Sequence, residues 1–260
     1  MMNRFSGWLI AAVVCATLTL TPRPAAAQPP ARGRAAAPKP GPVPRMPDGK
    51  PDLSGFWSLA SLRFGGDLAQ GKESEVPYTP LGQAALKNHD AKDDPTGKCF
   101  PPGMPRILHS PFPMQIMQDH NHLAMLFEYQ RIWRMIYVDG TPHHQDVDGT
   151  FMGDSIGKWE GDTLVIDTVG LNDRTWLDTA GHQHSADLHV IERLARTGPE
   201  TIAYEVTVDD PKMYAKPWTH TGTLTPQRAT KGLPELLEYF CNDNNVDVEH
   251  LTVPTKTGVQ

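Results

Sequence analysis

The chain has 260 residues and carries 24 basic and 30 acidic side chains, which gives a formal net charge of −6. An acidic chain without a run of basic residues lacks the electrostatic footprint of proteins that bind nucleic acid or anionic lipid. We therefore expect no nucleic-acid partner, and the length suits one domain with a sizeable core.

The first residues have the layout of a secretory signal peptide. Arg4 precedes an apolar stretch, Trp8–Leu20, and small residues follow it. The pattern predicts a signal peptide over residues 1–27 and a periplasmic or secreted protein. The apolar stretch is too short for a good spanning helix, so we expect no membrane insertion after cleavage. Residues 28–47 are rich in Pro and Ala and predict a flexible linker, followed by a single β domain over residues 48–260.

The domain begins with two elements that differ in type. The segment "DLSGFW" predicts a first strand, and "YTPLGQAALKNHD" predicts one short helix. Thr79 is suited to be the N-cap of this helix, and Pro80 to be its first residue.

From Met114 onward the pattern is that of β-strands. Short segments rich in β-branched and aromatic residues alternate with turn signals, and no segment with helical period lies between them. These segments are "MQIMQ", "HLAMLFEY", "RIWRMIYV", "GKWE", "DTLVIDTV", "LHVIERLA", "TIAYEVTV", "WTHTGTL" and "ELLEYFC". We expect an all-β fold, either an antiparallel meander barrel of the lipocalin/calycin kind or a bent sandwich.

Two cysteines remain after the predicted processing, Cys99 and Cys241. An even number in an exported chain favours a disulfide, here between "KCFPPGMPR" and the last predicted strand. The alternative is a pair of buried thiols.

Three motifs together resemble a large group of exported bacterial β-rich proteins. They are "MGDSIGKWEGDTLVIDTVGLNDRTWLD", "HSADLHVIER" and "YEVTVDDPKMYAKPW", and the resemblance covers most of residues 48–245. It implies export and a β architecture, and it implies no particular chemistry.

The connection over residues 170–187 departs from the regular hairpin spacing, with 18 residues that show neither strand nor helix periodicity. Loops of this length inside a compact domain are usually functional or disordered. Trp176 and Leu177 need apolar partners, which argues against disorder. We therefore expect a functional loop at the barrel mouth.

Histidines in and near this loop suggest a metal site. His182 and His184 are two residues apart, so in extended backbone they point the same way. A divalent metal on His182 and His184 is possible, with His189, His143 or His144 as a third ligand. The alternative is that these imidazoles only form hydrogen bonds.

A metal-free acid/base site is the second interpretation, with His184 as the acid/base and Asp173 or Asp178 as the group that orients it. The plainer alternative is that the aspartates cap turns. The catalytic candidates are His184, His189, Asp173 and Glu192. The ligand-binding candidates are Trp176, Asp178, His182, Tyr204, Tyr214 and Trp218.

Strand parity separates two of these candidates. In "LHVIERL", Glu192 shares a face with Leu188 and Val190, whereas His189 lies on the other face. A carboxylate on an apolar face is costly without a partner, so Glu192 is either inside the barrel, as an acid of raised pKa or a paired charge, or the apolar face is merely shallow. Without a bulge, only one of His189 and Glu192 lines the cavity.

"GDSIG" matches the G-x-S-x-G motif of serine hydrolases around Ser155. That motif requires a strand that turns into a helix, whereas a strand and a hairpin follow here. A Ser155 hydrolase is therefore a minor alternative.

These patterns favour an enzyme that acts on a small organic molecule in the barrel cavity. The expected chemistry is His/carboxylate acid–base catalysis of the lyase, isomerase or hydrolase type. No organic cofactor is expected, because the chain has neither a glycine-rich dinucleotide motif nor a P-loop. A non-catalytic small-molecule-binding barrel is the alternative.

Overall fold

The computed structural model describes residues 41–59, 66–227 and 234–241, which all fall within one structural unit, Pro38–Gln260. The predicted signal peptide and most of the predicted linker lie outside the described residues. Within those residues, no helix is long and apolar enough to cross a membrane.

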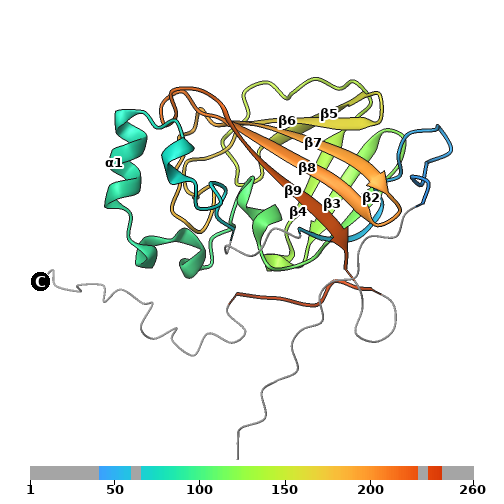
Figure 1. Cartoon of the computed structure of the whole chain (residues 1–260), viewed down its shortest axis with the longest axis horizontal. Coiled ribbons are helices and arrows are strands. Elements are labelled where there is room, and N and C mark those ends of the chain that lie inside the picture. The colour runs from blue at the N-terminus through green and yellow to red at the C-terminus, as the bar shows by residue number, and fades with distance from the viewer. Residues whose placement is uncertain (1–40, 60–65, 228–233, 242–260) are drawn as a thin grey trace, which may run out of the picture. The chain divides into compact units, whose positions relative to one another are not determined.

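Nine strands close into a barrel (Figure 1). Each strand pairs with the next one along the chain, and the last pairs with the first. The strands are β1 (Gly55–Leu59), β2 (Met114–Gln118), β3 (His122–Phe127), β4 (Trp133–Tyr137), β5 (Asp154–Glu160), β6 (Thr163–Val169), β7 (His189–Gly198), β8 (Thr201–Asp209) and β9 (Trp218–Pro226). The all-β barrel prediction is confirmed, and the bent sandwich does not apply.

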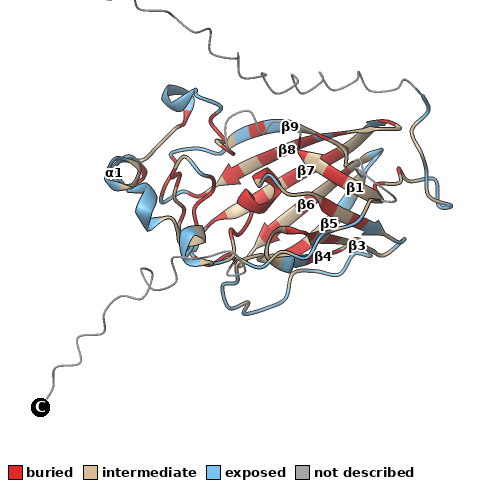
Figure 2. Ribbon diagram, turned by 90° about the horizontal axis from the view of Figure 1, so that it is seen from below, coloured by how far each residue is buried: buried red, intermediate tan, exposed pale blue. Residues whose placement is uncertain are grey.

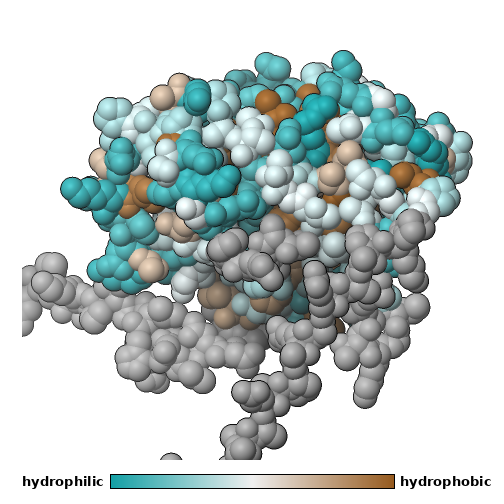
Figure 3. Space-filling model, viewed as in Figure 1, coloured by the Kyte–Doolittle hydropathy of each residue, from teal (hydrophilic) through white to brown (hydrophobic). Residues whose placement is uncertain are grey.

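Alternation of side chains produces the core. Along β6, Leu164, Ile166 and Thr168 are buried and their neighbours are not, as a strand with one face inside a barrel requires. The same alternation runs along β7 and β8 (Figure 2). On the outside, the face seen in Figure 3 is mostly hydrophilic with isolated hydrophobic side chains.

The barrel departs from a pure antiparallel meander at one place. β4 pairs with β5 in parallel, through Tyr137 and Ile156, and residues 138–153 form the connection that returns the chain. Gly157 allows the close approach, since a Cβ there would lie 2.8 Å from Cγ1 of Val138. The expectation of antiparallel pairing throughout was wrong here, because a strand pattern carries no information on strand direction.

The α-helix α1 (Pro80–Asn88) begins as predicted, with the hydroxyl of Thr79 accepting a hydrogen bond from the amide of Gly82 at 3.1 Å. It lies at the end of the barrel where β6 and β8 end and β7 and β9 begin (Figure 1), which we call the mouth. Short 3₁₀ helices complete the structure: η2 (Glu73–Glu75), η3 (Ala91–Asp93), η4 (Pro95–Lys98), η5 (Arg106–His109) and η6 (Tyr129–Arg131).

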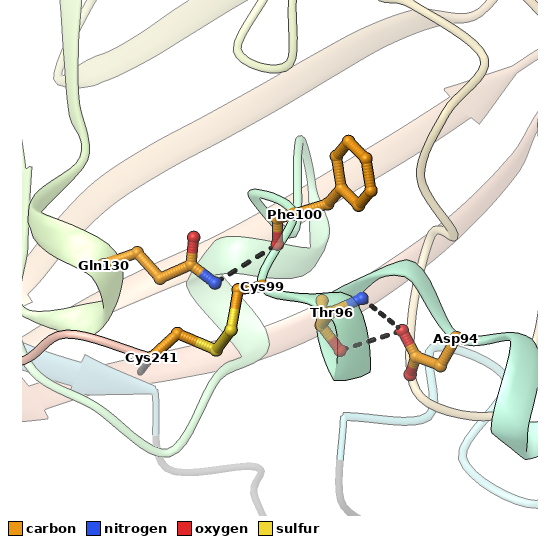
Figure 4. The surroundings of a disulfide bond; sticks show 6 residues. All are labelled: Asp94, Thr96, Cys99, Phe100, Gln130 and Cys241. Carbon is orange, nitrogen blue, oxygen red and sulfur yellow. Dashed lines mark hydrogen bonds between the residues drawn. A yellow bond between two sulfur atoms is a disulfide. The ribbon is translucent and has the colours of Figure 1, made fainter. Parts of the chain in front are cut away.

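The predicted disulfide between Cys99 and Cys241 is confirmed (Figure 4). The segment Glu235–Cys241, however, is not a strand. β9 already pairs with β1, so the closed barrel offers no free edge for a tenth strand. The segment is held instead by side chains and by a hydrogen bond from the amide of Leu237 to Glu128 at 2.8 Å.

Candidate ligand-binding site at the barrel mouth

An ion pair lies inside the barrel. Nη2 of Arg134, from β4, is 2.6 Å from Oε2 of Glu192, from β7, and the side chains are 1% and 0% exposed. Arg134 also donates to the hydroxyls of Ser155 at 2.9 Å and Thr168 at 2.6 Å, and the hydroxyl of Tyr204 donates to Glu192 at 3.3 Å. Of the alternatives that strand parity left open for Glu192, the structure shows a paired charge inside the barrel.

Two imidazoles meet near Tyr204. The rings of His109, from η5, and His220, from β9, are 4.8 Å apart in an edge-to-face contact, and His109 lies 5.9 Å from the ring of Tyr204. Nδ1 of His220 donates to the carbonyl of Leu68 at 2.9 Å, so its Nε2 is the unprotonated nitrogen. Burial lowers the pKa of His220 and lowers that of His109 to about 3, so both rings are neutral at physiological pH.

Several buried polar atoms at this end of the barrel have no hydrogen-bond partner among the described residues. They include Nη1 of Arg134, Nε2 of His109, Nε2 of His220 and Nε1 of Trp218; Nδ2 of Asn172 and Oε2 of Glu192, which is ion-paired with Arg134, also lack a hydrogen bond. Buried polar groups in folded proteins are nearly always hydrogen-bonded, so such a concentration of unpaired atoms indicates a place for a bound molecule or water.

A second polar group lies in the mouth, where His182 is held between two carboxylates. Its Nδ1 is 2.5 Å from Oδ2 of Asp178, and its Nε2 is 3.0 Å from Oε2 of Glu73, on η2. Burial alone would lower the pKa of His182, but its hydrogen bonds and charge interactions with Asp178 and Glu73 outweigh burial and raise it. The imidazole thus bridges the loop and η2.

Asp178 is the fixed member of this group. It is fully buried and accepts hydrogen bonds from the amides of Leu68, at 2.8 Å, and Ala180, at 3.0 Å. Glu73, in contrast, is 47% exposed and also accepts a hydrogen bond from the hydroxyl of Tyr78. The group thus has a rigid inner carboxylate and a solvent-accessible outer one.

Aromatic rings surround His182. Tyr78 is stacked on it at 6.1 Å, and the ring of Trp218 lies 5.7 Å away. Tyr214 contacts both Tyr78 and Trp218 at 5.4 Å. Burial raises the pKa of Tyr78 and of Tyr214, so both phenols keep their protons.

Two pockets border this end of the barrel. One, of about 350 Å³, includes Trp218 and His220 in its wall, and the other, of about 250 Å³, includes His109. The edge-to-face pair of His109 and His220 therefore lies between the two pockets. Both are large enough for a small organic molecule or part of one.

One group of metal-ligating side chains also lies in the mouth. Ligand atoms of Asp67, Asp178 and His182 all lie within 4.8 Å of one another, and this is the one such group of three found among the described residues. His184 is not part of it, although the sequence pattern paired His184 with His182.

His184 occupies a different environment. It is buried, its Nε2 is 2.7 Å from the hydroxyl of Thr175, and its Nδ1 is 3.0 Å from the carbonyl of Ser185. Burial lowers its pKa. With both ring nitrogens bonded inside the loop, its geometry is that of a group that stabilises the loop. Asp173, its predicted orienting group, is exposed.

Trp176 anchors the loop. It is buried, and its ring packs edge-to-face on His89 at 5.7 Å, next to the end of α1. Trp176 therefore positions the loop that carries Asp178 and His182.

His189 lies on the outer face of the barrel, as parity predicted, with Nε2 2.8 Å from Asp167. Nε2 of His143 reaches the same carboxylate at 3.1 Å, while Nδ1 of His143 and of His144 each lie 2.8 Å from Asp154. The predicted third ligands thus gather with each other on the outer surface, and the structure does not bring them to His182 or His184.

Ser155 lies within β5, and its hydroxyl contacts Arg134 and Thr168 at 2.9 and 3.1 Å. It is 3% exposed and follows no strand-to-helix turn. The geometry does not resemble a nucleophile elbow.

The sequence interpretation missed Asp67, Glu73, Tyr78, His109, Arg134 and His220. Two had a signal: the alternation that buries Leu224 in "WTHTGTL" also turns His220 inward, and the alternation that buries Ile136 in "RIWRMIYV" turns Arg134 inward. The others come from irregular segments and short 3₁₀ helices, which have no periodicity that indicates a direction.

Comparisons with known proteins add little to this description. No protein-family model matches the chain, and no curated protein matches it. Among solved structures it is similar to a mutant of the fluorescent protein UnaG, with 11% sequence identity and a TM-score of 0.33, over 68% of this chain and 97% of that one. We draw no functional conclusion from a similarity at this level.

Proposed function

We propose that the protein binds a small polar organic molecule at the barrel mouth. The observation that carries this proposal is the set of unpaired buried atoms on Arg134, His109, His220 and Trp218. Each unsatisfied buried group costs about 1–3 kcal/mol, and a ligand that pairs with several of them would offset this cost.

The charges indicate what kind of molecule fits. Glu192 already balances the charge of Arg134, and the rings of His109 and His220 are neutral. The part of the interior around Arg134 and the two imidazoles thus carries no excess charge. Nε2 of His220 requires a hydrogen-bond donor and Nη1 of Arg134 an acceptor, which suits an uncharged molecule with hydroxyl or amide groups.

The test is a thermal-shift screen of uncharged hydroxylated and amide-bearing compounds, followed by calorimetry of the hits. His220→Phe and Trp218→Phe each remove one of the unpaired atoms and should weaken binding by roughly 2–13-fold, the equivalent of one hydrogen bond. His122→Gln, on the outer surface, is the matched control. Hits whose affinity is unchanged in both mouth variants would contradict the proposal.

A catalytic function is the second candidate, favoured by the Asp178–His182–Glu73 group. Asp178 fixes the ring, and Nε2 of His182 shares a proton with the half-exposed Glu73. This proton can be passed to or from a molecule in the mouth, as lyase, isomerase or hydrolase chemistry of the acid/base kind requires. The proposal assigns the role to His182 and Glu73 in place of His184, whose ring nitrogens are both engaged.

This candidate is tested with Glu73→Gln and His182→Gln once a turned-over compound is known. Each should lower kcat by about 10²–10⁴-fold, the usual contribution of a positioned acid/base, with little change in melting temperature for the exposed Glu73. His184→Asn is the comparison: it should lower the melting temperature and leave kcat nearly unchanged. Wild-type kcat in Glu73→Gln would contradict the catalytic role.

A periplasmic or secreted location is part of the proposal. It is supported by the pattern of residues 1–27 and by the disulfide, because disulfides persist in oxidising compartments. N-terminal sequencing of the protein from its natural host should begin at Gln28. A cytoplasmic protein that begins at Met1 would overturn it.

A further inference from the structure

The mouth holds more negative charge than its described partners balance. Asp67, Glu73 and Asp178 contribute −3, and His182, even when protonated, returns only +1, which leaves −2. Among the described residues, no Lys or Arg forms an ion pair with any of these three carboxylates. Asp67 and Asp178 are close enough for like-charge repulsion, which a shared positive charge would relieve.

The three carboxylates differ in the hydrogen bonds that hold them. Asp67 accepts hydrogen bonds from the amides of Ala69 and Gly71, both at 2.8 Å, which fixes its position on the turn that follows Gly66. Asp178 is fixed by backbone amides of two segments. Glu73 contacts Nε2 of His182 and accepts a hydrogen bond from the hydroxyl of Tyr78.

A neutral imidazole lies beside this group. His220 is 5% exposed, its Nε2 has no partner among the described residues, and the charges of both Asp67 and Asp178 act on it. Its Nδ1 holds the carbonyl of Leu68, the residue that follows Asp67. His220 thus holds in place the segment that carries Asp67.

We propose that Asp67, Asp178 and His182 bind a divalent metal ion, with His182 as a ligand through Nδ1. The ion takes the place of the proton between Nδ1 and Asp178, and that proton leaves to solvent. Glu73 then accepts the Nε2–H of His182 and orients the ring, as carboxylates do behind metal-bound histidines. The inference deepens the proposed function and rests on it for the role of the ion beside a bound molecule.

The ligand set indicates which metals fit. Two carboxylates and one imidazole suit Zn²⁺, Mn²⁺ or Fe²⁺ better than Ca²⁺ or Mg²⁺, which prefer oxygen ligands. Around Zn²⁺, with bonds of about 2.0–2.2 Å, tetrahedral ligand atoms lie roughly 3.3 Å apart. The ligand atoms here lie within 4.8 Å of one another, so shifts of about 1.5 Å or less would bring them to this spacing.

The experiment is calorimetric titration of the EDTA-treated mature protein with Zn²⁺, and of its Co²⁺ form by visible absorption. We expect one ion per chain, bound at least tenfold more tightly than Ca²⁺. Asp67→Asn keeps an Oδ1 that can accept the amide hydrogen bond of Ala69, so it should fold, yet it should lower Zn²⁺ affinity at least tenfold. Glu73→Gln should lower it by about 10–100-fold, the usual effect of an orienting partner.

Two controls separate this site from other histidines. His122→Gln removes an exposed histidine that contacts Asp119, and His143→Gln opens the cluster on the outer surface. Both should keep wild-type Zn²⁺ affinity. Absence of binding to the wild type, wild-type affinity in Asp67→Asn, or loss of binding in His143→Gln alone would each overturn the proposal. None of these outcomes involves the organic ligand, so failure here is distinct from failure of the proposed function.

Discussion

The ion pair inside the barrel offers the sharpest test of the fold. Removing one partner leaves the other as an uncompensated charge in a site that is 0–1% exposed. Such single changes in buried pairs cost about 3–5 kcal/mol. Arg134→Met and Glu192→Gln should therefore each lower the free energy of unfolding by about that amount.

The double variant should behave differently. With both charges removed, neither remains without a partner, and replacement of a whole buried pair is often neutral or stabilising. Arg134→Met combined with Glu192→Gln should thus be more stable than either single variant. The hydroxyls of Ser155 and Thr168, which Arg134 now binds, still contact each other at 3.1 Å.

Urea denaturation followed by circular dichroism measures this cycle, and thermal melts report it independently. A domain of this size changes its Tm by about 2–4 °C per kcal/mol, so each single variant should melt roughly 6–20 °C lower. Single variants that lose less than about 1 kcal/mol, or costs that simply add in the double variant, would refute the reasoning. Either result would mean that water reaches the pair.

Three further predictions concern stability. Burial is the main cause that lowers the pKa of His109 from 6.5 to about 3. Below pH 6.5 the unfolded chain therefore binds a proton at His109 that the folded chain does not bind. The free energy of unfolding should fall as the pH drops below 6.5, by roughly 2–3 kcal/mol at pH 4.5. Urea denaturation at pH 7 and 4.5 checks this, and His109→Gln should lose that part of the pH dependence. Cys99 and Cys241 are 142 residues apart, and chain-entropy models assign a bridge of this span about 5 kcal/mol. Replacing both by Ser should lower Tm strongly, and an unchanged Tm would contradict this. A Cβ at Gly82 would lie 2.1 Å from the carbonyl oxygen of Met213, so Gly82→Ala should cost about 1–3 kcal/mol, although alanine normally favours helices; a stabilised variant would show that α1 is free to shift.

Local patterns in the sequence determined much of the fold. The period-2 alternation in β6 to β9 predicted the strands and placed Glu192 and His189 on opposite faces, because successive side chains of a strand point to opposite faces. The start of α1 followed from Thr79 and Pro80, since capping involves only neighbouring residues. The disulfide followed from the even number of cysteines in a chain predicted to be exported.

The residues of the candidate site could not be paired from the sequence, because they come together only when the barrel closes. His182 contacts Glu73, which lies 109 residues away in the sequence, whereas His184, two residues further on, contacts Thr175. The spacing of the two histidines could not reveal this, since the segment between them pairs by a single bridge, Trp176 to Gln183, and is not part of a longer strand. The direction of β5 and the absence of a tenth strand were likewise decided by the closure of the sheet. Sequence patterns record which face a residue occupies within its own element, and only the packing of elements decides which residue it faces.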